Sequence, residues 1–235
     1  MTTPRSDTRQ GFRPQTAADS IGARLRERLL EGGFLPGESI SIRRVSEAEG
    51  ISVIPARDAL RGLVAEGALQ FRDARTIFVP PLDAATLGEI RHARLAIEGE
   101  LAHRAFPWLA PQAARLAAID AEVTTALRAR DVPAYMRSNH ALHFAIYEPA
   151  GAPVLLALAE LLWLRFAPGM RIVCDAFDGQ PPRADHHVGA IEALRAGDRD
   201  GFRRAIEADI AQGMDMLLDH ATRTPDGGVA NEGET

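Results

Sequence analysis

The stretch GISVIPARDAL, residues 50–60, decides how the N-terminal part of the chain folds. Gly50 can end one short helix. Ser52 can cap the next, because a serine side chain accepts a hydrogen bond from a free N–H at a helix start. Pro55 falls in the first turn, where proline is tolerated. Apolar residues recur at helical spacing, at Ile54, Ala59, Leu60 and Leu63. The stretch therefore predicts two helices joined by a tight glycine turn.

Helix and hairpin patterns flank this stretch on both sides. Upstream, Asp19 and Ser41 are predicted N-caps of two further helices, the second over residues 42–49. Downstream, the short segments 68–72 and 76–80 predict a β-hairpin. Three helices followed by a hairpin are the outline of a winged helix-turn-helix, a fold that binds double-stranded DNA.

Arginines gather where such a fold meets DNA. The candidate contacts are Ser52, Arg57 and Arg61 on the predicted recognition helix, Arg43 and Arg44 on the helix before it, and Arg72 and Arg75 beside the wing. Arg57 and Arg61 are four residues apart and share one helix face. Outside this fold, such a pair would indicate only a solvated face; within it, cations at this position favour contact with the major groove.

From residue 82 onward the pattern is helical almost throughout. Helices are predicted over 84–105, 111–130, 133–148, 152–167, 184–196 and 198–220, with a loop over 168–183. We therefore expect a mainly α protein whose second domain is an all-helical bundle. The predicted divisions are a disordered arm at 1–18, a DNA-binding domain at 19–81, a helical domain at 82–221 and a disordered tail at 222–235.

Composition limits the class of protein. The single cysteine, Cys174, rules out an internal disulfide and fits a reducing cytoplasm. The apolar run 154–166 is shorter than the roughly 20 residues that span a bilayer, so no membrane association is expected. Residues 1–82 hold 12 arginines against 10 acidic residues, whereas the remainder holds 15 against 22. The net charge of −5 therefore hides a more positive N-terminal end.

A single winged helix makes few phosphate contacts, so its affinity for DNA would be low. Two copies related by a two-fold axis double the contacts and read a palindromic operator. We therefore expect a homodimer, with its dimer surface in the helical domain.

The chain also resembles the GntR family of bacterial regulators, in its FadR branch with the helical FCD effector domain, over about residues 21–220. The matching strings are LPGE at 35–38, the stretch at 50–60, LVAEG at 63–67, EIR at 89–91, RLAIE at 94–98, NHALH at 139–143, AGAP at 150–153, His187, and ALRAGD at 193–198. The resemblance implies a transcription regulator, expected to be a repressor, whose residues 82–221 bind a small carboxylate effector and dimerise.

By this resemblance, Arg43, Ser52 and Arg57 match family positions that touch DNA. The chain departs from the family at Val53, where arginine is usual, and at Thr76, where glycine is usual. Residue 53 is therefore expected to recognise bases differently, through methyl contacts, and the wing to lie differently against the minor groove.

The resemblance also implies a metal site. Asn139 and His143 are four residues apart and point the same way on a predicted helix. Metal-binding members of the family place ligands at these positions, at His187 and at the position of Asp209, where a third histidine is usual. This donor set suits a divalent metal, zinc first, with nickel, manganese or iron(II) also open. Asp209 is short, so we expect it to reach the metal through water.

Alternatives remain open at these positions. The histidines can instead be hydrogen-bonded core residues, and His186 replaces His187 if the helix phase is off by one. Arg94 matches the family arginine that pairs with an effector's carboxylate; its alternative is an exposed salt bridge with Glu98. For the whole chain, the alternatives are a metal-dependent enzyme carrying a winged helix, and a DNA-binding module with an inert bundle.

Overall fold

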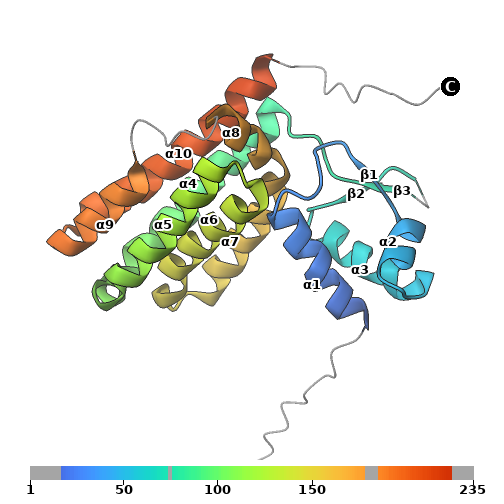
Figure 1. The fold of residues 1–235 in the computed structure, drawn as a ribbon, viewed down its shortest axis with the longest axis horizontal. Coiled ribbons are helices and arrows are strands. Elements are labelled where there is room, and N and C mark those ends of the chain that lie inside the picture. Colours follow the sequence, from blue (N-terminus) through green and yellow to red (C-terminus); the bar gives the residue numbers. More distant parts are fainter. Residues whose placement is uncertain (1–16, 74–75, 178–184, 224–235) are drawn as a thin grey trace, which may run out of the picture.

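The N-terminal head packs its helices on a small sheet (Figure 1). The computed structural model describes residues 17–73, 76–177 and 185–223. The head contains α1 (Ala17–Leu30), β1 (Ser39–Ser41), α2 (Ile42–Ala48), α3 (Val53–Ala65), β2 (Gln70–Phe71) and β3 (Thr76–Phe78). Gly50 has the positive φ of +63° that the predicted tight turn between α2 and α3 needs. The winged helix-turn-helix outline is thus confirmed.

The strand β1 was not predicted. It pairs antiparallel with β3, so that the sheet order is β1-β3-β2, and Ile40 lies opposite Ile77. Both isoleucine side chains are buried in the head. A strand of three residues gives too short an alternation to be recognised before its partner is known.

Two helix starts differ from their predictions. α1 begins at Ala17, so Asp19 lies in its first turn, where a negative charge still favours the exposed N–H groups. Ser52 occupies the N-cap of α3, but its side chain makes no capping hydrogen bond. One reason is Pro55, which stands three residues into the helix and has no N–H to donate. The Ser52 hydroxyl is therefore exposed and not committed to the helix.

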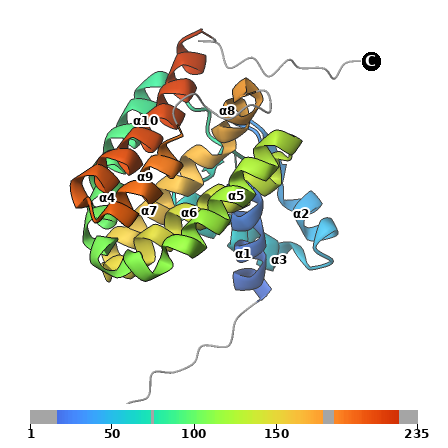
Figure 2. The same ribbon diagram turned by 60° about the vertical axis from the view of Figure 1, so that its left-hand side comes forward.

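The remaining elements form the helical bundle (Figures 1 and 2). They are α4 (Ala84–Leu109), α5 (Ala113–Ala129), α6 (Val132–Tyr147), α7 (Pro153–Phe166), α8 (Met170–Phe177), α9 (His186–Ala196) and α10 (Arg199–Arg223), with short 3-10 turns at Ala110–Gln112, Glu148–Ala150 and Ala167–Gly169. The helix α10 packs against both α4 and α9. No strand occurs after β3 in the described part of the bundle, as predicted.

Two predictions based on proline as a helix breaker are wrong. The first helix of the bundle continues past Pro107 to Leu109. The carbonyl of His103, which loses its helical N–H partner at this proline, accepts hydrogen bonds from the Arg199 guanidinium at 2.9 and 3.1 Å. The predicted loop at 168–183 instead contains α8, which buries Met170, Val173 and Cys174 on one face. The rest of that loop, residues 178–184, lies outside the described residues.

The predicted arm and tail fall almost wholly outside the described ranges. At its C-terminal end α10 extends to Arg223, so the first two residues of the predicted tail are helical. Residues 1–16 and 224–235, and Arg75 of the predicted wing, lie outside the described residues.

The segment Pro153–Phe177 differs from the expectation that no stretch is long enough to span a bilayer. Its length and composition alone would allow it to cross a membrane. In the structure it is divided into α7, a 3-10 turn and α8, and 44% of its apolar window is buried in the bundle. The core helices of soluble proteins can have the same length and apolar composition. These two properties are therefore weak evidence for membrane association.

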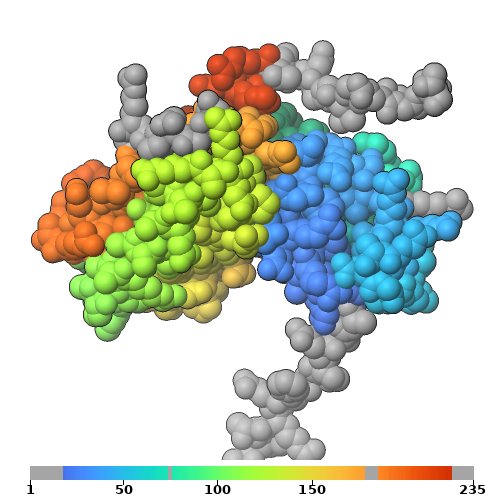
Figure 3. Space-filling model, viewed as in Figure 1, coloured from blue at the N-terminus to red at the C-terminus, as the bar shows by residue number. Residues whose placement is uncertain are grey.

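Head and bundle each have an apolar core, and α7 contributes to both. The outer surface shows the head and the bundle packed against each other (Figure 3). Leu164 of α7 is 2% exposed and packs within the head's core, whereas its neighbour Trp163 packs within the bundle's core. Arg137 of α6 pairs with Glu31 at the end of α1 at 3.0 Å. The helix α6 and the N-terminal head are therefore in direct contact.

Replacing Leu164 with alanine tests this junction. We expect Leu164→Ala to lower the free energy of unfolding by about 2–5 kcal/mol, because it opens a cavity in a packed core. The same deletion at exposed Leu35 (49% exposed) is the matched control and should change stability by less than about 0.5 kcal/mol. Urea denaturation followed by circular dichroism measures both. Equal losses in the two variants would contradict the buried placement of Leu164.

Candidate functional site

Three helices of the bundle bring four of the predicted residues to one place. Asn139 and His143 come from α6, His187 from the start of α9, and Asp209 from the middle of α10. The Asp209 carboxylate lies 3.1 Å from Nε2 of His143 and 3.2 Å from Nε2 of His187. Asn139 and His143 are almost fully buried. The structure thus groups side chains that lie up to 70 positions apart in the chain.

Hydrogen bonds orient the His143 ring. Its Nδ1 lies 2.9 Å from the Tyr147 hydroxyl, and that hydroxyl donates to Oε2 of Glu98 at 2.8 Å. Since the tyrosine has only one proton and gives it to Glu98, its oxygen must accept from Nδ1–H of His143. The neutral ring then has its free lone pair on Nε2, the atom that faces Asp209.

His187 is oriented in the same way by a different residue. Its Nδ1 lies 3.0 Å from the buried carboxylate of Asp120 on α5. A carboxylate can only accept, so Nδ1 carries the proton and Nε2 keeps the lone pair. Metal-bound histidines usually donate their other N–H to a carboxylate or similar acceptor, which fixes the ring orientation.

Two imidazole lone pairs directed at one carboxylate require a cation between them, either a proton or a metal ion. Donor atoms bound to one ion at about 2.1 Å lie about 3.0–3.4 Å apart, and the spacings about Asp209 are 3.1 and 3.2 Å. The buried Oδ1 of Asn139 has no hydrogen-bond partner among the described residues, and Nε2 of His187 has only the Asp209 carboxylate beside it. A buried polar atom without a partner is costly, so this donor set fits a metal ion.

In the metal-free protein, protons supply the positive charge. Burial disfavours the charged form of His187, but the Asp209 and Asp120 carboxylates outweigh it and raise the pKa of His187 to about 10. Burial also works against ionisation of Asp209, yet the neighbouring His187 and His143 lower the pKa of Asp209 well below its usual value. A metal ion therefore competes with protons for these donors.

A small cavity beside these donors has a volume of about 30 Å³. We call it the inner cavity; its lining includes Arg94, Tyr135, Asn139, His143, Trp163 and Asp209. It has room for one or two water-sized ligands. The carboxylate of Asp209 contacts both histidines directly. The expectation that Asp209 reaches a metal ion through water stays a prediction.

Arg94 differs from both interpretations made of it. Its Nε and Nη2 bind the two oxygens of Glu98 at 2.6 and 3.0 Å, so the fork expected to hold an effector's carboxylate is already occupied. The pair is also not exposed, because Arg94 is 4% and Glu98 0% accessible. Phe166 stacks 4.0 Å from the guanidinium carbon. This apolar shell desolvates the pair, a property that i, i+4 spacing alone cannot show.

Neighbouring histidines have other surroundings. His187, not His186, lies beside Asp209, so the predicted helix phase was right. His140 stacks on Phe144 with ring centres 4.1 Å apart and meets the edge of Trp163. Burial lowers the pKa of His140 to about 4, so this ring is neutral at physiological pH.

Several supporting residues were missed by sequence reasoning. Tyr147 had a usable signal, since it stands four residues after His143 on the same helix. Glu98 was named as a partner of Arg94, but its contacts with Tyr147 and Trp163 were missed. Asp120 and Trp163 had none, because they reach the site from α5 and α7 through packing alone. Trp163 donates from Nε1 to Oε2 of Glu98 at 3.1 Å.

Four of the predicted DNA-contacting residues, Arg43, Arg44, Val53 and Arg57, line one groove of the head. This groove of about 590 Å³ runs between the starts of α2 and α3 and the sheet. Its lining is Ser39, Ser41, Ile42, Arg43, Arg44, Val53, Arg57 and Thr76. Arg61 is exposed one turn beyond Arg57. Arg43 pairs with Glu47 at 2.8 Å on the open surface.

One correction adds a residue to this surface. Ile54 is not a core residue but is 73% exposed, because the buried positions of α3 are Ala56, Ala59, Leu60 and Leu63. Ile54 therefore shares the outer face with Arg57 and Arg61. Periodicity traced back from Leu60 and Leu63 would have shown this.

Comparison with known proteins identifies the family. The FCD domain model matches residues 89–212, and the model of the bacterial regulatory proteins of the gntR family matches residues 17–79. The chain belongs to the GntR family of bacterial regulators with an FCD domain. It is 28% identical over 204 residues to the HTH-type transcriptional regulator McbR of Escherichia coli (strain K12), covering 85% of this chain and 91% of that protein.

Solved structures agree with this assignment. The E. coli McbR/YncC structure superposes with a TM-score of 0.80 at 26% identity, covering 87% of this chain and 98% of that one. A putative transcriptional regulator GntR from Rhodococcus sp. RHA1 shares the fold, with a TM-score of 0.73 at 18% identity over 86% of this chain and 97% of that one. The protein is therefore a DNA-binding transcriptional regulator, and the enzyme alternative is set aside because these families are regulators.

A charge-removing substitution tests the buried network at Glu98. We expect Glu98→Gln to lower the free energy of unfolding by about 3–5 kcal/mol, because the desolvated Arg94 charge loses its counter-ion. Glu100→Gln on the same helix is the control. Glu100 pairs with Arg104 at the surface, so its loss should cost about 1 kcal/mol or less. Urea denaturation measures both, and a Glu98→Gln variant as stable as its control would contradict the role given to the pair.

Proposed function

We propose that this regulator holds a divalent metal ion through Asn139, His143, His187 and Asp209, and that a small carboxylate bound at this ion changes its affinity for an operator. The observation that carries the proposal is the orientation of both histidines. Tyr147 and Asp120 hold the Nδ1 protons, so both Nε2 lone pairs point at Asp209. The fourth donor, Oδ1 of Asn139, is buried with no hydrogen-bond partner among the described residues.

The chemistry of the donors limits which metal ions the site can bind. Two imidazoles with one carboxylate and one amide oxygen suit zinc first, and nickel, manganese or iron(II) also accept such a set. Four protein donors leave room at a six-coordinate ion for an effector's carboxylate. In this arrangement Arg94 acts through Glu98, whose carboxylate holds Tyr147 and hence His143, and contacts an effector only along the wall of the inner cavity.

The coupling to DNA runs through α6 and α7. The helix that carries Asn139 and His143 also carries Arg137, which pairs with Glu31 of the head. A ligand that binds one placement of α6 more tightly than another therefore also favours one placement of the head. We propose that two copies act together on a palindromic operator in the cytoplasm, since one groove offers few phosphate contacts.

Substitution of the adjacent histidines tests the metal site. We expect His187→Ala to weaken zinc binding by more than about 100-fold. Loss of a residue that only supports a metal ligand already costs about 10–100-fold, and His187 is proposed as a ligand itself. His186→Ala removes the same ring one position away and should leave the zinc affinity unchanged. Chelator competition and the metal content of the purified protein measure both.

The supporting hydrogen bond gives a second readout of the same site. Asp120→Asn preserves the shape of the side chain but removes the negative charge that accepts the hydrogen bond from Nδ1–H of His187. Zinc affinity should therefore fall by about 10–100-fold. Full zinc binding by His187→Ala, or identical losses in both histidine variants, would refute the proposed donor set.

The DNA face is tested by removing one cation. We expect Arg57→Ala to weaken binding by about tenfold or more to genomic fragments selected by the wild-type protein, because a groove arginine contributes about 1–3 kcal/mol. Arg128→Ala removes an exposed arginine of α5, on the bundle, and serves as the control. Fluorescence anisotropy at fixed salt measures both. Unchanged affinity in Arg57→Ala would remove this residue from the interface.

A further inference from the structure

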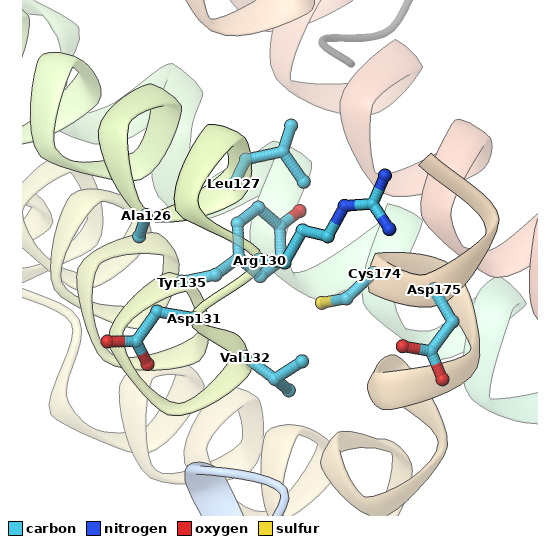
Figure 4. A pocket seen from close by; sticks show the side chains of 8 residues that line it. All are labelled: Ala126, Leu127, Arg130, Asp131, Val132, Tyr135, Cys174 and Asp175. Atoms are coloured by element: carbon cyan, nitrogen blue, oxygen red, sulfur yellow. The ribbon is translucent and has the colours of Figure 1, made fainter. Parts of the chain in front are cut away.

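A second pocket lies between α5, α6 and α8 (Figure 4). Its volume is about 270 Å³, and we call it the outer pocket. Its walls are Ala126 and Leu127 from α5, Val132 and Tyr135 from α6, and Cys174 from α8. Three exposed charged residues, Arg130, Asp131 and Asp175, complete the lining, so an apolar interior meets a charged rim. The pocket is about nine times as large as the inner cavity.

The two spaces share one wall, the side chain of Tyr135. Tyr135, Asn139 and His143 follow each other at four-residue intervals, so they lie on one face of α6. The outer pocket therefore begins one helical turn, about 5.4 Å, before the first metal donor. Tyr135 is 7% exposed and lines both spaces, so the inner cavity and the outer pocket meet at this side chain.

The chemistry of the outer pocket differs from that of the inner cavity. Burial raises the pKa of the Cys174 thiol to about 12, so this sulfur is an uncharged, weakly polar wall. Figure 4 shows the thiol, the Tyr135 ring and the Val132 side chain around the same space. Charged side chains occur at its exposed side, where Arg130 and Asp175 are accessible to water. The interior is suited to a hydrocarbon chain or ring, not to a second charged group.

We propose that the outer pocket receives the apolar tail of the effector, whose carboxylate head binds in the inner cavity, with Tyr135 positioned between the head and the tail. The effector class is therefore a metal-chelating acid with an aliphatic or aromatic tail of about four carbons or more, since the tail must pass one turn of α6. This inference rests on the proposed metal and carboxylate site.

A homologous series of ligands tests the proposal. The probes are straight-chain 2-hydroxy acids from lactate to 2-hydroxyoctanoate, titrated by calorimetry into the full-length, zinc-loaded protein. We expect weak binding of lactate, and then an affinity that rises about threefold to fourfold for each added CH₂ once the tail passes Tyr135. This measurement on the unaltered protein needs no variant.

A filled pocket provides the matched comparison. Ala126→Leu places extra side-chain volume in the outer pocket, whereas Ala129→Leu adds the same atoms at an exposed position on the same helix. We expect Ala126→Leu to abolish the gain with chain length while keeping lactate affinity and zinc content, and Ala129→Leu to behave as the wild type. Thermal melts confirm that both variants are folded.

The outcomes separate this inference from the proposed function. If lactate binds but affinity does not change with tail length, the outer pocket does not receive the effector, and the metal and carboxylate site stands. If the chain-length gain persists in folded Ala126→Leu, the tail binds elsewhere and the inference is overturned. If no acid of any length binds the zinc-loaded protein, the carboxylate site fails and this inference fails with it.

Discussion

The bundle depends on one buried carboxylate. Glu98 is inaccessible to solvent and accepts hydrogen bonds from Arg94, Tyr147 and Trp163, which belong to three different helices. A charge removed from water is tolerated only when it is paired and its remaining lone pairs are satisfied. This requirement fixes α4, α6 and α7 relative to one another, because each of these helices contributes a donor to Glu98.

The same network orients the side chains of the proposed metal site. Because Glu98 takes the only proton of Tyr147, the Tyr147 oxygen accepts from His143, whose other nitrogen then faces Asp209. Asp120 performs the equivalent task for His187 from α5. A structural ion pair and a binding site are thus parts of one chain of hydrogen bonds. Disturbing Glu98 is expected to affect both fold and ligand binding, which is why stability must be measured beside binding.

The position of α6 and α7 explains how such a site can influence a distant head. Leu164 packs in the head while Trp163, one residue earlier, donates to Glu98. On α6, Arg137 contacts the head two positions before Asn139 contacts the inner cavity. Short paths of this kind, through rigid helices, carry a change in packing without requiring the whole bundle to deform.

The sequence by itself determined the winged helix-turn-helix, the helical bundle and the residues that meet at the metal site, because helical periodicity, caps and glycine turns are local and the family strings are contiguous. It could not place Ile54 outside the core without the correct helix phase, and it placed a loop over α8 because of the prolines and glycines around it. Only the tertiary structure decided that Arg94 is occupied by Glu98, that Asp209 reaches both histidines and that Asp120 supports His187. These facts depend on the distances between helices, and those distances are set by packing between segments far apart in the chain.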